Sequence, residues 1–247
     1  MSEKRDVLGN VWDRDLLAFL ELHKNFNFSK EIDCFTDSFS EIWSAKVYTY
    51  CKEIQRGMTV LDVGSCFGSF SIYAVAKGAK KVYALEAQPI REAKQKEVIK
   101  KLNLSDVIVS LPYALWFKEA NLRIEIDHIN FGAGEYTKAM TLDQFVKDFN
   151  IEKVDFIKID TEGCELPIIA GAQTTIRRDH PIFAIAAYHE RHYTVNGEWL
   201  DNPTPPTITK KSQMDAIITL FKQYPEYTYA IKSEGWAMNE MVTFFLK

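Results

Sequence analysis

Cysteine is scarce in this 247-residue sequence, and the four cysteines are scattered at Cys34, Cys51, Cys66 and Cys164. None of them forms a CxxC pair, so the spacing supports neither a zinc site nor the framework of a disulfide-rich secreted domain. Isolated cysteines are usually buried as small apolar side chains. We therefore expect four reduced thiols, which is typical of a cytosolic protein.

Long apolar runs and strongly basic segments are also missing. No apolar run approaches the length of about 18 residues that a membrane span requires, and the charged start MSEKRDVLGN does not resemble a secretory signal. The chain has 30 basic and 34 acidic residues, a formal net charge of −4. Because no run of Lys or Arg stands out, we predict a cytoplasmic protein that binds neither nucleic acid nor membranes. A small or local substrate is the expected partner.

The chain length suits one large α/β domain with a full core. After helical patterns at 12–20 and about 40–55, apolar runs of strand length alternate with helix-like segments, which indicates a parallel sheet with helices on both faces. The last two runs are joined by a short polar connection, which predicts a terminal antiparallel pair. The expected strands are Thr59–Val63, Lys81–Leu85, Val107–Val109, Val154–Ile159, Pro181–Ala187, Tyr227–Lys232 and Met241–Leu246, and the expected helices are 71–77, 90–102, 140–149, 165–177 and 213–223.

The stretch LDVGSCFGSF, at 61–70, contains two glycines directly after the first expected strand. A ligand of an open α/β sheet binds in the crevice outside the strand ends, and glycines allow the backbone to approach it. Gly64, Ser65 and Gly68 are therefore candidate cofactor-binding residues. The dinucleotide fingerprint GxGxxG needs a further glycine where this chain has Cys66, so a pyrophosphate ligand is disfavoured.

Two acidic residues narrow the choice of ligand. Asp62 lies just before the loop, where a carboxylate repels phosphates but could hold an ammonium group directly or through water. Glu86 ends the second expected strand about 20 residues later, the place where an acidic side chain bonds both ribose hydroxyls. NAD and S-adenosylmethionine share that diol, but S-adenosylmethionine has an ammonium group and no phosphate. Asp62 and the missing glycine therefore favour S-adenosylmethionine as the cofactor.

Three segments resemble the FkbM family of S-adenosylmethionine-dependent methyltransferases: Thr59–Pro89, Ala139–Val146 and Val154–Ala172. The last is the most specific, because its KIDxEGxE pattern is similar to the family's signature at the end of the fourth strand. The resemblance implies a class I methyltransferase fold, a Rossmann-like α/β architecture with a seven-stranded, mostly parallel sheet and an antiparallel terminal strand, here preceded by N-terminal helices. It also implies O-methylation of a hydroxyl on a sugar or natural product.

Acidic and imidazole side chains follow the fourth and fifth expected strands. We interpret Asp160, Glu162 and His189 as the catalytic group facing the acceptor, although capping and helix-dipole roles would also explain the carboxylates. His189 is the preferred base, because an unperturbed imidazole has a pKa of about 6.5. His189 and His192 face opposite ways on a strand, so we predict no metal, with a divalent ion beside Asp160 as the less favoured alternative.

Three further segments have weaker assignments. Tyr113 and Ala114, after the third expected strand, would line the adenine. The glycine-containing stretch 126–136 could meet the acceptor. The proline-rich stretch 199–207 is either a lid over the strand ends or a plain connector.

The sequence therefore predicts an O-methyltransferase that acts on a small-molecule or glycan acceptor. N-methylation and cofactor binding without turnover remain alternatives. We assign 1–56 to an N-terminal helical cover and 57–247 to the methyltransferase domain. An exposed face of the helix at 12–20 could form a homodimer contact, although covering the sheet of its own chain explains that helix equally well.

Overall fold

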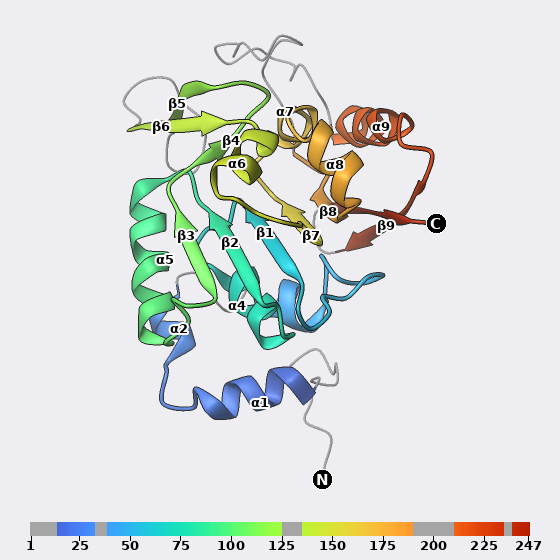
Figure 1. Cartoon of the computed structure of the whole chain (residues 1–247). Helices are drawn as coiled ribbons and strands as arrows, with labels where there is room; N and C mark the ends of the chain where they lie inside the picture. Colours follow the sequence, from blue (N-terminus) through green and yellow to red (C-terminus); the bar gives the residue numbers. More distant parts are fainter. Residues whose placement is uncertain (1–13, 33–38, 125–134, 190–209, 235–238) are drawn as a thin grey trace.

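The computed structural model describes residues 14–32, 39–124, 135–189, 210–234 and 239–247. Its centre is a seven-stranded sheet with the order β3-β2-β1-β7-β8-β10-β9 (Figure 1). Within it, β10 runs antiparallel to both of its neighbours, whereas the other pairings are parallel. The predicted sheet is thereby confirmed. Its strands are β1 (Thr59–Val63), β2 (Lys81–Leu85), β3 (Ile108–Leu111), β7 (Phe156–Ile159), β8 (Ile182–Ala186), β9 (Tyr227–Glu234) and β10 (Asn239–Leu246).

Helices cover both faces of the sheet, so the central strands β1 and β7 are buried throughout and mostly apolar, with Asp62 and Lys158 as their charged residues. On one face Val60 and Phe156 pack with α1, α4 and α5, and on the other Leu61 and Ile157 pack with α6, α7, α8 and α9. Side chains alternate along a strand, so Asp62 and Lys158 point toward the α4 face. The helices are α1 (Arg14–Leu22), α4 (Ser69–Ala76), α5 (Pro89–Lys101), α6 (Leu142–Asp148), α7 (Glu165–Ala170), α8 (Gln173–Asp179) and α9 (Lys210–Phe221).

The segment before β1 differs from the helix expected at about 40–55. A π-helix, η1 (Phe39–Ser44), is followed by turns. Lys46 has a left-handed φ of 52°, and the VYTY sequence after it is rich in β-branched and aromatic side chains, which form helices poorly. Thr49 instead packs on α4, where its Oγ1 lies 3.0 Å from the hydroxyl of Tyr73. The prediction of a second long helix is therefore wrong.

The N-terminal segment shares its apolar core with the sheet. Leu16 and Phe19 of α1 and Trp43 of η1 belong to the same buried cluster as the residues of α4. A short helix, α2 (Phe28–Glu31), lies between α1 and η1. The domain boundary at residue 56 stays a prediction, and the first two residues of the helix expected at 12–20 lie outside the described residues.

A second, three-stranded sheet was not anticipated from the sequence. It has the order β4-β6-β5 and lies beside α6 (Figure 1). Its strands are β4 (Ala114–Leu115), β5 (Ala120–Ile124) and β6 (Glu135–Met140). The two-residue β4 is too short to give a pattern of alternation. The sequence of β5, ANLRI, does alternate between apolar and polar residues, but it is only five residues long. Of the stretch 126–136, residues 126–134 lie outside the described residues and the last two begin β6.

The single helix expected at 165–177 is divided into α7 and α8. The chain turns at Gly171, where an added Cβ would lie 2.5 Å from the carbonyl oxygen of Trp116. This close backbone contact explains why a glycine interrupts the helical pattern. The first of the two helices, α7, begins at Glu165, after the short turn that follows β7.

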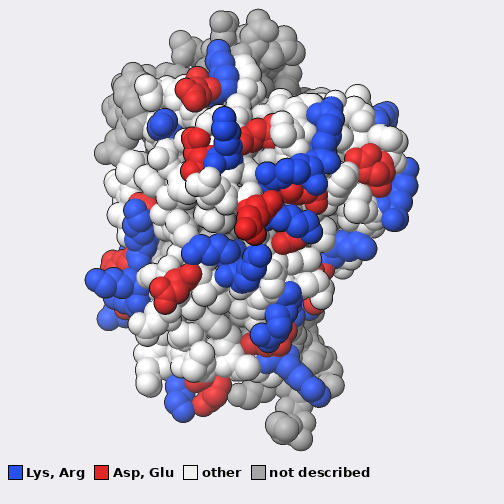
Figure 2. Space-filling model, in the orientation of Figure 1, with Lys and Arg blue, Asp and Glu red and all other residues white. Residues whose placement is uncertain are grey.

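Charges of both signs are interspersed on the face of the molecule shown in Figure 2. Pairs such as Lys211–Asp215 and Lys24–Glu21 are exposed, so each adds little to stability. Among the described residues, no helix has the length and apolar character needed to cross a bilayer.

Candidate functional site

The loop between β1 and α4 is fixed by its two glycines. Gly64 has φ of 75°, and a Cβ there would lie 1.8 Å from the carbonyl oxygen of Asp160. Gly68 has φ of 88° and immediately precedes α4. Ser65 is buried, and its Oγ accepts a hydrogen bond from Gln95 Nε2 at 2.6 Å. Gly64 therefore allows the end of β1 to lie directly against the end of β7.

Glu86 follows β2 and holds this loop from the side. Its carboxylate accepts hydrogen bonds from the backbone N–H groups of Cys66 at 2.8 Å and Gln88 at 2.9 Å. Burial raises the pKa of Glu86 although these hydrogen bonds lower it. Each oxygen of a carboxylate has more than one lone pair, so Glu86 can also accept hydrogen bonds from a ribose. The structure thus places Glu86 beside the loop, where the sequence spacing predicts it.

The donors of the loop are largely engaged inside the protein. The N–H groups of Gly64 and Ser65 both bond to the carbonyl oxygen of Leu85, and that of Gly68 bonds to Ser65. A pyrophosphate is normally bound by free backbone N–H groups at such a loop. With Cys66 N–H also engaged by Glu86, the site fits a nucleoside without phosphate better than a dinucleotide. This donor set is compatible with S-adenosylmethionine.

The described cysteines are free thiols, as the sequence predicts. They are Cys51, Cys66 and Cys164, whereas Cys34 lies outside the described residues. Burial raises the pKa of the Cys66 thiol to about 11, so this loop residue is uncharged at neutral pH.

Asp62 and Lys158 form a buried ion pair behind the loop. Asp62 Oδ1 lies 3.1 Å from Lys158 Nζ, and Ser71 donates a hydrogen bond to Asp62 Oδ2 at 2.7 Å. Lys158 also donates to the carbonyl oxygen of Gly64 at 2.6 Å. Burial lowers the pKa of Lys158, but the carboxylates of Asp62 and Asp160 raise it overall, so the ammonium group stays charged. An internal ammonium group thus contacts Asp62, and the expected contact with a ligand stays a prediction.

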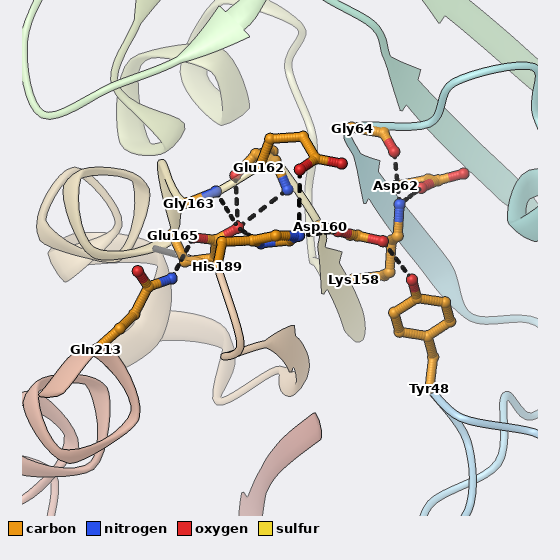
Figure 3. Close-up of polar contacts among 11 residues, drawn as sticks. Tyr48, Asp62, Gly64, Lys158, Asp160, Glu162, Gly163, Glu165, His189 and Gln213 are labelled. Atoms are coloured by element: carbon orange, nitrogen blue, oxygen red, sulfur yellow. Dashed lines mark hydrogen bonds and ion pairs between the residues drawn. The ribbon is translucent and has the colours of Figure 1, made fainter. Parts of the chain in front are cut away.

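Asp160, Glu162 and His189 converge after β7 and β8 (Figure 3). His189 Nε2 lies 3.6 Å from Asp160 Oδ1 and 3.5 Å from Glu162 Oε2. Tyr48 donates a hydrogen bond to Asp160 Oδ2 at 2.5 Å. The side chain of His189 is 10% exposed and that of Glu162 is 81% exposed, so the cluster is open at the glutamate. The structure therefore brings together the three residues that the sequence singles out as catalytic.

Glu165, the first residue of α7, is the buried anchor of this cluster. Its Oε1 accepts hydrogen bonds from the backbone N–H groups of Thr161 at 3.1 Å and Gly163 at 2.9 Å, and it lies 3.0 Å from His189 Nδ1. Gln213 of α9 donates to the other oxygen at 2.6 Å. Figure 3 shows the resulting line of contacts from Gln213 through Glu165 and His189 to the acidic cluster.

Sequence reasoning missed Tyr48 and Gln213. They reach the cluster from the N-terminal segment and from α9, and they lie 112 and 48 residues from Asp160 and Glu165, respectively. Neither residue belongs to a motif, and hydrophobic periodicity cannot pair residues so far apart. Glu165 lies inside the KIDxEGxE pattern, so the motif marks it, but its contact with His189 becomes evident only in the structure.

The charge of His189 is set by the carboxylates around it. Burial by itself lowers the pKa of His189, but Glu165, Asp160 and Glu162 raise it to about 9. The imidazole is therefore protonated at neutral pH in the absence of a ligand. The expectation that His189 has a pKa near 6.5 is therefore wrong, because that value applies to an isolated imidazole without neighbouring carboxylates.

This raised pKa predicts a pH-dependent stability. The folded-state pKa of His189 lies above its reference value of 6.5, so the stabilisation is fully present below about pH 6.5 and is lost as pH rises through about 9. A shift of that size corresponds to about 3 kcal/mol. We expect the free energy of unfolding, measured with urea in buffer containing EDTA, to fall across this range. His189→Gln should remove most of the fall, and an unchanged slope in that variant would assign it to other groups.

Tyr113 lies in the short connection between β3 and β4, and Ala114 is the first residue of the small sheet. The ring of Tyr113 packs edge-on against Phe149 with centroids 6.1 Å apart. Ala114 begins β4 and is buried with Trp116 in a cluster that Ala87 also contacts, so it is close to the chain that follows Glu86. Their contact with adenine stays a prediction. His192 and the stretch 199–207 lie outside the described residues.

The order of the main sheet and the two loops at its centre define a class of protein. A glycine loop follows the first strand, an acidic residue follows the second, and the last strand is antiparallel, which is the arrangement of class I methyltransferases. A family model described as the methyltransferase FkbM domain matches residues 62–229. The chain therefore belongs to the FkbM methyltransferase family, and the resemblance inferred from its motifs is confirmed.

The solved structures that share this fold include two methyltransferases. A methyltransferase FkbM from Methylobacillus flagellatus KT is 16% identical with a TM-score of 0.59, and the match covers 94% of this chain and 59% of that chain. The present chain thus spans about three fifths of that protein. An O-methyltransferase from Bacillus cereus, in complex with SAH, is 15% identical with a TM-score of 0.50, and the match covers 95% of this chain and 91% of that chain. Family membership agrees with the S-adenosylmethionine predicted from the loop.

Proposed function

We propose that the chain transfers a methyl group from S-adenosylmethionine to a hydroxyl of a sugar or natural-product acceptor. The observation that carries this proposal is the contact between the glycine loop after β1 and the turn after β7, which holds the polar cluster. Gly64 of the cofactor loop lies against the backbone of Asp160, so the expected cofactor crevice and the polar cluster share one edge of the sheet. A methyl donor at the loop would therefore face groups that can bind a hydroxyl and take up a proton.

Each side of the site has a distinct task. When bound, S-adenosylmethionine supplies an electrophilic methyl group, whose transfer to a hydroxyl acceptor releases one proton. Glu86 would bind the ribose hydroxyls, and Asp160 and Glu162 would accept hydrogen bonds from the acceptor. Such positioning contributes about 7–11 kcal/mol to lowering a barrier in favourable cases.

His189 is the proton acceptor in this proposal. Its Nδ1 is held by Glu165, which leaves Nε2 directed at the acidic cluster. A well-placed general base accelerates proton removal by roughly 10²- to 10⁴-fold. Because the pKa of His189 is about 9, the fraction of neutral imidazole and hence the rate should rise from neutral pH toward pH 9.

Methyl transfer from labelled S-adenosylmethionine to a panel of hydroxylated acceptors tests the proposal. Label should enter an acceptor hydroxyl, and His189→Ala should lower turnover while leaving the affinity for S-adenosylhomocysteine nearly unchanged. Equal losses of turnover and affinity would assign His189 a structural role. Tight cofactor binding without transfer to any acceptor would favour a binding module.

N-methylation is a second candidate, favoured by the three carboxylates around His189. Asp160, Glu162 and Glu165 would attract an acceptor that carries an ammonium group. An amine that arrives neutral needs less help from a base, so a flat pH profile and tolerance of His189→Ala would support this activity over O-methylation.

The role assigned to Glu86 leads to a quantitative expectation. Glu86→Ala should weaken the binding of S-adenosylhomocysteine by about 1.5–3 kcal/mol, the contribution of hydrogen bonds to a charged group. Calorimetric titration measures this change. Glu97→Ala is the matched control, because Glu97 is an exposed carboxylate of α5 that pairs with Lys101. Unchanged affinity in the Glu86 variant would remove this residue from the cofactor site.

A further inference from the structure

Three potential metal ligands meet at the ends of two neighbouring strands. His189 contributes an imidazole nitrogen, and Asp160 and Glu162 contribute one carboxylate oxygen each. These three atoms all lie within 4.8 Å of one another. Asp160 and Glu162 lie in the turn after β7, and His189 lies three residues after β8. Because β7 and β8 are adjacent parallel strands, these two segments leave the same edge of the sheet side by side.

Groups outside this triad orient two of its members. Glu165 Oε1 lies 3.0 Å from His189 Nδ1, which leaves Nε2 directed toward Asp160 and Glu162. Histidines that bind metals usually bond their other nitrogen to a carboxylate or carbonyl in this way. Glu165 is itself buried and held by Gln213 and by backbone N–H groups.

The second orienting contact comes from the N-terminal segment. Tyr48 donates its hydroxyl to Asp160 Oδ2 at 2.5 Å, so Oδ1 is the oxygen that faces His189. One imidazole nitrogen and two carboxylate oxygens therefore point at a common centre. The accessible side is that of Glu162, whose side chain is 81% exposed.

We propose that Asp160, Glu162 and His189 bind a divalent cation such as Mn²⁺ that helps to bind the acceptor. Mixed imidazole and carboxylate ligands suit divalent first-row metals, and three protein ligands leave coordination positions open for acceptor oxygens. This inference deepens the proposed methyl transfer and rests on it for the role of the cation. His189 is then a ligand instead of the base, and binding of the cation displaces the Nε2 proton to solvent. The acceptor hydroxyl, made more acidic by the cation, would release its own proton to water.

The site differs from the metal alternative considered from the sequence. That alternative joined His189 to His192, which lies outside the described residues. The structure points to Glu162 in its place, because the left-handed φ of 52° at this residue turns the chain after β7.

Binding of Mn²⁺ to the 247-residue chain tests the inference without an acceptor. The protein is stripped with EDTA, freed of chelator and titrated with Mn²⁺, and electron paramagnetic resonance measures the free ion. We expect one site per chain, and about tenfold or greater loss of affinity in Glu162→Gln and in Asp160→Asn. Glu162→Gln is the more secure variant, because an exposed side chain can be changed without disturbing the core. Glu152→Gln is the matched control, since Glu152 is exposed and lies before β7, at the opposite edge of the sheet.

Tyr48→Phe adds a graded test. It removes the hydrogen bond to Asp160 but no ligand, so Mn²⁺ affinity should fall less than in Asp160→Asn. No binding at millimolar Mn²⁺, or binding that Glu162→Gln and Asp160→Asn leave unchanged, would overturn the metal site. Titration of the same samples with S-adenosylhomocysteine in EDTA separates the two proposals: cofactor binding without Mn²⁺ binding contradicts the metal alone, and absence of cofactor binding contradicts the methyltransferase proposal.

Discussion

Replacing Gly64 by alanine should destabilise the fold by more than about 4 kcal/mol, beyond the usual range of point substitutions. The added Cβ would lie 1.8 Å from the carbonyl oxygen of Asp160 and 2.8 Å from its carbonyl carbon. Both are backbone atoms of the chain that leaves β7, so no flexible side chain can move aside. The ends of β1 and β7 would have to separate, and the cofactor loop and acidic cluster would separate with them. Urea unfolding measures the loss.

Gly57→Ala is the matched control for this change. Gly57 also has a left-handed φ, of 87°, but nothing lies within 4 Å of an added Cβ. Only the conformational penalty applies there, about 1–2 kcal/mol. Similar losses of stability at the two positions would show that φ alone is responsible and that β1 and β7 do not approach as closely as described.

Glu165→Ala should cost about 3–5 kcal/mol, as expected when one partner of a buried charge network is removed. The change leaves the N–H groups of Thr161 and Gly163, the Gln213 amide and the His189 imidazole without their acceptor. Loss of the nearest carboxylate should also lower the pKa of His189 toward its ordinary value. Chemical denaturation and NMR titration of the imidazole measure these two effects.

Glu162→Ala provides the comparison for Glu165→Ala. Both residues lie after β7 and face His189, but the side chain of Glu162 is 81% exposed and that of Glu165 is fully buried. Removing the exposed carboxylate should change stability by less than about 0.5 kcal/mol, as at most surface positions. If both variants were equally destabilised, the central role of Glu165 in the network would be wrong.

The sequence was most informative where burial on both faces imposed continuous apolar runs. β1 and β2 begin and end at the predicted residues, and the terminal antiparallel pair follows from the short connection before β10. Prediction failed where tertiary contacts override local preference. The chain around Lys46 turns away from the expected helix to pack on α4, and Gly171 divides a helical pattern because Trp116 lies against it.

The site could be predicted in part, because its residues sit at strand ends within recognisable motifs. Glu86 was located from its spacing to the glycine loop, and Asp160 and His189 from the strands they follow. Their electrostatics could not be predicted. The pKa of His189 depends on Glu165, and the orientation of Asp160 depends on Tyr48, which is distant in the sequence.

Parallel calorimetric titration with S-adenosylmethionine, S-adenosylhomocysteine and NAD tests the central claim most directly. The loop engages its N–H groups internally and presents Glu86 beside them, so it should bind the two adenosyl compounds and not the dinucleotide. Micromolar affinity for both, with no heat from NAD, is the predicted result. Binding of NAD alone would contradict the assignment of the loop and of every site residue that depends on it.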